Sequence, residues 1–405
     1  MIKILDKIKS SQLFSVSLYT GISTAIKLLT GFVTAKVIAV HIGPQGIGVL
    51  GQLLSFLAIV MPLSIGATGN GVIKYLAEYT GKSEAQNKVL KASLVITCFC
   101  SLLISLILIL GASNWSLILF DSDNYTDVIA MLGFTLVFYA AFTLGTSILN
   151  GLKEYKRFNY ANISASIFGL IFSYVLMVNY GIKGALLATV TYQSVVFIVL
   201  FFFLRNVRQF NFMAVYKARP AKRIYYNLFQ YSLMAIISAA TVPVAQIIIR
   251  KYIVSHVSDT AMGFYEGINR LSGLYMSIIV TVLSVYYLPK LSEITNSRLL
   301  RREIFKGYRI ILPATFVLLI AIYFLKDLVI TIVFSETFRE MNGYFLPQIA
   351  GDFFKIASWL LAFNMLAKAM TKLYIITEVV FTGTLIMASV LFVDTWGAVG
   401  AVYAY

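Results

Sequence analysis

Apolar runs long enough to cross a bilayer recur along this chain and limit its fold more than any other feature. A hydrocarbon core about 30 Å thick needs about 20 apolar residues in a helix. The sequence holds such runs at 14–40, 47–79, 89–112, 127–150, 158–179, 183–204, 224–252, 258–289, 308–326, 343–368 and 372–393. Charged residues make up only 12% of the chain, about half the usual share, so lipid must cover its apolar surface. The pattern predicts an all-α polytopic membrane protein.

The runs form two sets, and a weak internal repeat relates them. A shift of 215 positions pairs Lys36 with Lys251, Gly48 with Gly263, Leu76 with Leu291 and Glu78 with Glu293. Because six spans separate the copies, they share one orientation, as in a parallel repeat. We therefore expect two six-helix lobes, 1–204 and 224–405, joined by a hydrophilic cytoplasmic linker at 205–223. Twelve helices are expected, and the last is only begun by Gly397–Tyr405, as in a fragment.

The basic residues lie mainly in alternate loops. One side holds Lys3, Lys7, Lys9, Lys82, Lys88, Lys91, Lys153, Lys156, Arg157, the linker cations, Lys290, Arg298, Arg301, Arg302, Lys306, Arg309, Lys368 and Lys372; the other holds Lys183, Lys326 and Arg339. By the positive-inside rule, the N-terminus is cytoplasmic. The net charge of +16 is thus a topology signal, which excludes nucleic-acid binding. The segment Met1–Ser10 is expected to be amphipathic and uncleaved.

Several charged residues remain inside the predicted spans. They are Lys27, Lys36, Lys74, Arg250, Lys251, Arg270 and Lys355, with the acids Glu78, Glu266, Asp352 and Glu378. A charge near the bilayer centre costs at least about 2.5 kcal/mol, so each should face a partner or a water-filled cavity. The excess of basic groups predicts a cationic interior.

Spacing separates these charges into different cases. Glu266 and Arg270, at i,i+4, and Asp352 and Lys355, at i,i+3, each share one helix face. Internal ion pairing and the lining of a transport cavity both explain such pairs. Lys27 has no acid at helical spacing, which favours a cavity or an anionic ligand.

The remaining span charges have a simpler alternative. Lys74 and Glu78 lie toward the cytoplasmic end of a span too long for the bilayer, which favours a solvated helix face over a cavity. Snorkelling to the interface accounts equally for Lys36, Arg250 and Lys251.

Other motifs do not predict chemistry. Gly46, Gly48 and Gly51 match the dinucleotide fingerprint, but they follow no strand, so no cofactor is expected. Cys98 and Cys100 are expected to be core thiols, without metal partners. Pro62, the glycines of 66–71 and Pro243 indicate either bendable helices for alternating access or close packing of small residues.

Six segments in order resemble the Wzx-type flippases of O-antigen and enterobacterial common antigen (lipid III) synthesis, within the multidrug/oligosaccharidyl-lipid/polysaccharide exporter superfamily. They are His41–Gly48, Asn70–Tyr79, Val242–Lys251, Val285–Ser292, Gly351–Lys355 and Ala367–Lys368. The resemblance implies a two-lobe transporter that moves an undecaprenyl-pyrophosphate-linked glycan to the periplasmic leaflet, with membrane lipid and other polysaccharide-assembly membrane proteins as its surroundings.

A pyrophosphate favours basic contacts. The expected substrate-binding residues are Lys27, Lys36, Lys74, Arg250, Lys251, Arg270 and Lys355, with Asn70 and Tyr75 for sugar hydroxyls. Glu266 and Asp352 are candidates for ion coupling.

Two alternatives remain open. A cation-coupled small-molecule exporter of the same superfamily needs an acid-rich cavity, whereas the excess charge here is basic. A membrane polysaccharide polymerase or ligase needs a large outer loop with catalytic groups, and the outer loops here are short.

Overall fold

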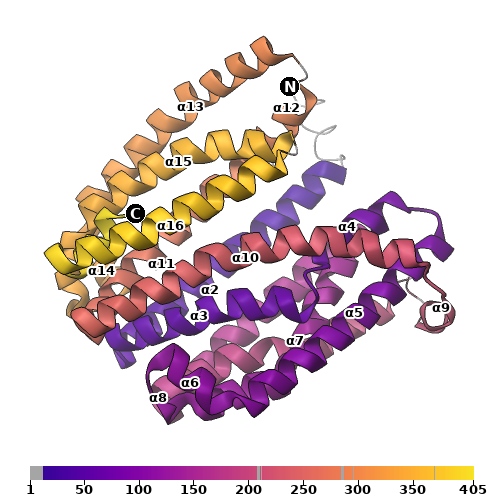
Figure 1. The fold of residues 1–405 in the computed structure, drawn as a ribbon, viewed down its shortest axis with the longest axis horizontal. Coiled ribbons are helices and arrows are strands. Elements are labelled where there is room, and N and C mark those ends of the chain that lie inside the picture. Colours follow the sequence, from indigo (N-terminus) through magenta and orange to yellow (C-terminus); the bar gives the residue numbers. More distant parts are fainter. Residues whose placement is uncertain (1–11, 208–209, 211, 284–286, 295, 369) are drawn as a thin grey trace. The chain divides into compact units, whose positions relative to one another are not determined.

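The computed structural model describes residues 12–405, except 208–209, 211, 284–286, 295 and 369. All of its secondary-structure elements among the described residues are helices (Figure 1). In chain order, the first are α2 (Gln12–His41), α3 (Pro44–Ser64), α4 (Gly69–Glu78), α5 (Ser83–Leu110), α6 (Ala112–Phe120), η1 (Asp123–Tyr125), α7 (Thr126–Gly151), α8 (Tyr155–Arg205), α9 (Phe212–Lys217) and α10 (Lys222–His256). Then follow α11 (Asp259–Val282), α12 (Leu288–Glu293), α13 (Ser297–Phe324), α14 (Lys326–Val333), η3 (Glu336–Tyr344), α15 (Phe345–Ala367), α16 (Thr371–Trp396) and α17 (Ala398–Tyr403). The prediction for Met1–Ser10 lies outside the described residues.

Eight helices among the described residues are long and apolar enough to cross a membrane. One of them, α8, covers the two predicted spans 158–179 and 183–204. Gly181, whose dihedral angles are non-helical, lies between the two spans. The predicted all-α polytopic fold is confirmed. The number of twelve spans stays a prediction.

The chain forms two compact units. Unit 1 holds the described residues up to Val37 and Phe56–Ala240, and unit 2 holds Ile38–Ser55 and Thr241–Tyr405. Residues 38–55, predicted in the first lobe, lie in unit 2, and residues 224–240, predicted in the second lobe, lie in unit 1. Glycine contacts between the start of α3 and α11 account for the placement of 38–55 in unit 2. The repeat lobes and their linker stay a prediction.

Unit 1 is built around α7, which packs against α4, α5 and α8. Its core cluster includes Leu76, Leu90, Leu149 and Leu200, one from each of these helices, all almost completely buried. At Gly133 of α7, an added Cβ would lie 3.1 Å from a backbone oxygen of α5. Small residues at such points let membrane helices approach closely.

In unit 2, α15 packs against α11, α12 and α13. The buried cluster here includes Tyr287, Leu291, Leu360 and Phe363. It stabilises the part of α15 that follows Asp352, so the backbone that carries this acid has neighbours on several sides.

The predicted span 47–79 is wrong as a single helix. It is divided into α3 and α4 by a turn in which Gly66 and Ala67 have φ angles of 60° and 50°. A left-handed residue cannot continue a right-handed helix. The glycines of 66–71, which indicated a bend or close packing from the sequence, mark this break.

The prediction that the cysteines are core thiols is also wrong. Cys98 is exposed and Cys100 is only half-buried. They lie on α5, a candidate span, whose outer face meets lipid. A thiol behaves as a small hydrophobe, so lipid exposure carries little cost for it.

One local geometry occurs twice, 216 residues apart. Gly181 and Gly397 have φ,ψ angles of 57°, −139° and 63°, −155°, and each follows a long apolar helix. Three residues later, a Cβ at Gly184 or Gly400 would overlap the carbonyl oxygen of Leu176 or Phe392 respectively. Both units therefore reverse the chain with the same glycine turn.

Candidate functional site

A buried triad of charged side chains lies in unit 2. Glu266 of α11 accepts hydrogen bonds from Arg250 of α10 through Nη2 at 2.7 Å and Nε at 3.0 Å. Its other oxygen accepts from Arg270 Nε at 3.2 Å, one helical turn away. Arg250 also donates to the hydroxyl of Ser55 at 2.7 Å. The three side chains carry two positive charges and one negative charge.

Burial differs among the members of the triad. Arg250 and Glu266 are only 4% and 5% exposed, whereas the side chain of Arg270 is 17% exposed. Nη2 of Arg270 has no hydrogen-bond partner among the described residues. Because a carboxylate neutralises only one guanidinium, the triad keeps an uncompensated positive charge, which is nearest the surface at Arg270.

Glycines allow the triad to form against α3. A Cβ at Gly51 would lie 2.6 Å from Oε1 of Glu266, and a Cβ at Gly48 would overlap the side chain of Met262. From the other side, a Cβ at Gly263 would overlap the carbonyl oxygen of Pro44. The glycines that resemble a dinucleotide fingerprint thus serve close helix packing.

A second buried polar cluster surrounds Asp352 of α15, which has no exposed surface. Its carboxylate accepts hydrogen bonds from Ser272 Oγ at 2.8 Å, from the hydroxyl of Tyr275, and from Tyr405 Oη at 2.9 Å. Gln348 Nε2 donates to it at 3.2 Å. All four donors are neutral, so the carboxylate is stabilised without a direct charge partner in these hydrogen bonds.

The predicted pair of Asp352 and Lys355 is joined through Tyr405. Lys355 Nζ donates to Tyr405 Oη at 2.7 Å and lies 4.4 Å from the centre of the same ring. The tyrosine hydroxyl accepts from the ammonium and donates to the carboxylate. One hydroxyl thus bridges the ammonium and the carboxylate.

The predicted site residues of unit 1 are more accessible. Lys27 of α2 is exposed in the middle of a candidate span, and no hydrogen bond or ion pair joins its ammonium to the described residues. On α4, Asn70 and Lys74 are exposed, and Tyr75 is half-buried with its ring 6.2 Å from that of Tyr79. Lys74 Nζ lies 5.1 Å from the centre of the Tyr75 ring.

Two further predicted residues lie toward the ends of their helices. Lys36 and Lys251 are both half-buried near the ends of α2 and α10. The structure therefore brings together Arg250, Glu266 and Arg270, links Asp352 to Lys355, and gathers Asn70, Lys74 and Tyr75 on one short helix.

Sequence reasoning missed several members of these clusters: Ser55, Ser272, Tyr275, Gln348 and Tyr405. A signal existed for Gln348, because Gln348, Asp352 and Lys355 repeat at i, i+4 and i+7 on one face of α15. Ser272 and Tyr275 are likewise three residues apart on α11. Nothing in local spacing connects Tyr405 to Asp352.

The all-helical fold and its eight candidate membrane spans among the described residues define a multi-pass membrane protein. The fold is similar to that of a multidrug resistance MATE family transporter of the MOP superfamily in an inward-facing conformation, with a TM-score of 0.78 at 14% identity, covering 93% of this chain and 90% of that one. It is also similar to the lipid II flippase MurJ in an inward closed conformation, with a TM-score of 0.69 at 15% identity, covering 96% of this chain and 84% of that one.

The chain belongs to the family of polysaccharide biosynthesis proteins, whose family model matches residues 48–342. Its relatives include proteins named Lipid III flippase from Escherichia coli (strain K12) and Shigella flexneri. Each is 29% identical over 392 residues, which cover 96% of this chain and 93% of the relative. The resemblance seen in the six sequence segments is confirmed at the level of the family.

Proposed function

We propose that this chain is a flippase that carries an undecaprenyl-pyrophosphate-linked oligosaccharide from the cytoplasmic to the periplasmic leaflet by alternating access. The glycan is an O-antigen or enterobacterial common antigen repeat. Family membership and the relatives named Lipid III flippase support this function. The observation that carries it is the net positive charge of the buried triad, since a pyrophosphate needs cationic contacts.

Within the triad, Arg270 is the residue that we expect to meet the pyrophosphate. It is the most exposed member and has an unpartnered guanidinium nitrogen among the described residues. Arg250 is enclosed and holds Glu266, so its role is to position that carboxylate. In unit 1, Lys27 offers an exposed ammonium at mid-span, where hydrocarbon would disfavour it.

The other predicted contacts remain part of the proposal. Asn70 and Tyr75 are suited to sugar hydroxyls, and Lys36, Lys74, Lys251 and Lys355 supply further positive charge. We place the protein in the bacterial inner membrane with a cytoplasmic N-terminus, on the distribution of basic loops. Membrane lipid and other polysaccharide-assembly proteins are its proposed neighbours.

For ion coupling, the two candidate acids differ. Glu266 lies between two guanidinium groups, so protonation would leave both cations without a counter-charge. Asp352 accepts hydrogen bonds from neutral groups, which tolerate a charged or a neutral carboxyl more evenly. We therefore propose Asp352, and not Glu266, as the group that exchanges a proton or cation. We expect Asp352→Asn to abolish gradient-driven transport of the glycan lipid and to retain its transport down a concentration gradient.

The rival functions make different demands. An exporter of cationic drugs needs an excess of acid, whereas the triad has two guanidinium groups for one carboxylate. A polymerase or ligase needs catalytic groups outside the membrane, whereas Asp352 and Lys355 lie inside a candidate membrane span. Both comparisons favour a transporter of an anionic substrate.

The test is transfer of a radiolabelled polyprenyl-pyrophosphate glycan across proteoliposomes that contain the chain. Arg270→Gln should reduce the transport rate by roughly tenfold to a hundredfold. This factor corresponds to the loss of about 1.5–3 kcal/mol, the contribution of a hydrogen bond to a charged group. Arg339→Gln is the matched control, because Arg339 is 73% exposed and pairs with Glu336 on η3. Wild-type export of cationic dyes without glycan transfer would overturn the proposed function.

A further inference from the structure

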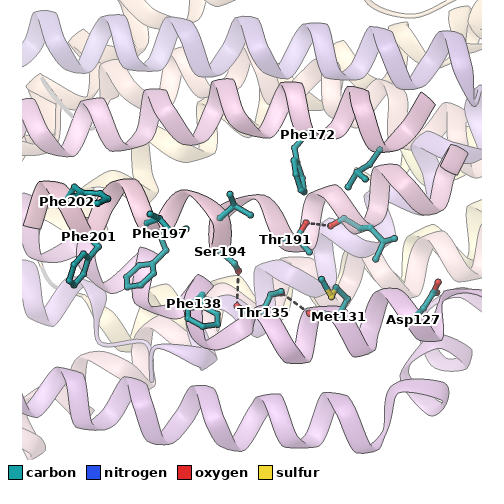
Figure 2. Close-up of a pocket in the computed structure, with 14 residues that line it drawn as sticks. Asp127, Met131, Thr135, Phe138, Phe172, Thr191, Ser194, Phe197, Phe201 and Phe202 are labelled. Atoms are coloured by element: carbon teal, nitrogen blue, oxygen red, sulfur yellow. Dashed lines mark hydrogen bonds between the residues drawn. The ribbon is translucent and has the colours of Figure 1, made fainter. Parts of the chain in front are cut away.

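A long apolar groove lies in unit 1. It has a volume of about 960 Å³ and lies between α7 and the two halves of α8. Figure 2 shows Phe172 above the groove, Phe197, Phe201 and Phe202 along the second half of α8, and Phe138 on α7. All of these helices are candidate membrane spans.

The polar atoms of the groove are already bonded. Thr135 Oγ1 donates to the carbonyl oxygens of Met131 and Val190, and Ser194 Oγ donates to the carbonyl oxygen of Thr135 at 2.8 Å. Thr191 Oγ1 donates to the carbonyl oxygen of Leu187. The hydroxyls of Thr135 and Ser194 join α7 to α8, that of Thr191 bonds within α8, and none of the three offers a free donor to a polar ligand. The groove therefore suits hydrocarbon.

The length of the groove separates two kinds of hydrocarbon. Its lining on the second half of α8 extends from Leu187 to Phe202, a separation of fifteen positions or about 22 Å at 1.5 Å per residue. An acyl chain of a phospholipid crosses one leaflet, about 15 Å or half of the hydrocarbon core, so it fills only part of this length. A polyprenyl chain is long enough to fill it and to cross the bilayer midplane.

An ion pair marks one end of the groove. Lys183 Nζ lies 3.4 Å from Oδ2 of Asp127, and both side chains are about half exposed. Asp127 is in the first turn of α7, and Lys183 follows the glycine turn at Gly181. The hydrocarbon end of a lipid tail held in the groove would contact the phenylalanines. The other end of the tail would lie at this ion pair.

We infer that the α7–α8 groove binds the polyprenyl tail of the lipid-linked substrate; this inference rests on the proposed function and adds a tail site to it. Lipid is as apolar as the groove, so affinity derives from shape and van der Waals packing and not from the hydrophobic effect. Branched methyl groups against five phenylalanine rings provide such packing. Tail length, and not headgroup charge, should control binding here.

A groove-filling variant tests the site in proteoliposomes. Ile198 lines the groove and is 60% exposed, whereas Val178 is 54% exposed on the same helix and lies outside the lining. Ile198→Trp should slow a glycan pyrophosphate with a full polyprenyl tail roughly tenfold, within the range of overpacking one side chain, and leave a short-tailed analogue unaffected. Val178→Trp should change neither rate.

The outcomes are distinguishable. Equal rates for Ile198→Trp and Val178→Trp with the long-tailed substrate would overturn the tail site and leave the flippase function standing. Transport of neither substrate by the wild-type chain would overturn both. A second measurement needs no variant. A diazirine-bearing polyprenyl phosphate should label the peptide that contains 187–202, and excess phosphatidylglycerol present during irradiation should not reduce this labelling. Reduced labelling would make the groove an ordinary phospholipid site.

Discussion

Replacing Glu266 with glutamine removes the carboxylate that Arg250 and Arg270 share in unit 2. The side chain keeps its shape, but the new amide brings N–H donors toward guanidinium groups that are themselves donors. Two buried or partly buried cations lose the group that accepts hydrogen bonds at 2.7, 3.0 and 3.2 Å. Removing one partner of a buried ion pair costs about 3–5 kcal/mol, because the remaining charge is uncompensated.

The assay is unfolding of the purified chain in mixed detergent micelles, followed by the loss of helical circular dichroism. Glu266→Gln should lower the free energy of unfolding by about 3–5 kcal/mol with an unchanged denaturant slope. Glu336→Gln is the control, because Glu336 is 63% exposed in its pair with Arg339. An exposed pair contributes about 0–1 kcal/mol. A Glu266→Gln protein as stable as the control would refute the uncompensated-charge reasoning.

A triple variant separates stability from transport. Arg250→Met, Glu266→Leu and Arg270→Met together remove every charge of the triad and leave apolar side chains in their place. Such replacements of buried charges are often neutral or stabilising by about 1–4 kcal/mol. We expect this protein to fold at least as well as the wild type and to lose glycan transport. Retained transport would show that the triad is structural only.

Three further predictions concern glycines and the lone lysine. Gly263→Ala should destabilise the α3–α11 contact by about 1–3 kcal/mol through overpacking, measured by the same unfolding assay, whereas Gly273→Ala on the same helix meets nothing within 4 Å and should be neutral or stabilising. Gly181→Ala and Gly397→Ala should each cost about 1–3 kcal/mol of backbone strain; unequal effects would contradict the repeated turn geometry. Lys27→Met should preserve or raise thermal stability, since a mid-span charge is costly, and reduce glycan transfer in proteoliposomes; a loss of stability would indicate a partner for Lys27.

The membrane fold was predictable because its cause is local. A run of about 20 apolar residues must span a bilayer as a helix, whatever the rest of the chain does. The ends of helices depend instead on turn geometry, which amino-acid composition predicts less well. The break between α3 and α4 depends on left-handed residues at Gly66 and Ala67; the glycines of 66–71 indicated a bend there, but nothing in the sequence indicated a left-handed alanine.

The charged clusters were predictable only in part, for a related reason. Spacing along one helix places Glu266 and Arg270 together, but Arg250 joins them from another helix, and Tyr405 reaches Asp352 from 53 positions away. Such partners are set by helix packing. The excess of basic over acidic residues in the spans was the useful guide, because charge balance does not depend on knowing which helices touch.

The glycines of α3 link the packing of unit 2 to the placement of its charges. A Cβ at Gly51 would meet Glu266, and close approach at Gly48 and Gly263 brings the two helices together. The carboxylate is therefore enclosed by the backbone of α3 as well as by Arg250. A shift of α3 along α11 would change the burial of Glu266 and, with it, the charge that Arg270 presents. A substrate anion that binds Arg270 better in one arrangement than in the other must bias that shift by the difference in affinity, which is the condition for coupling binding to helix movement.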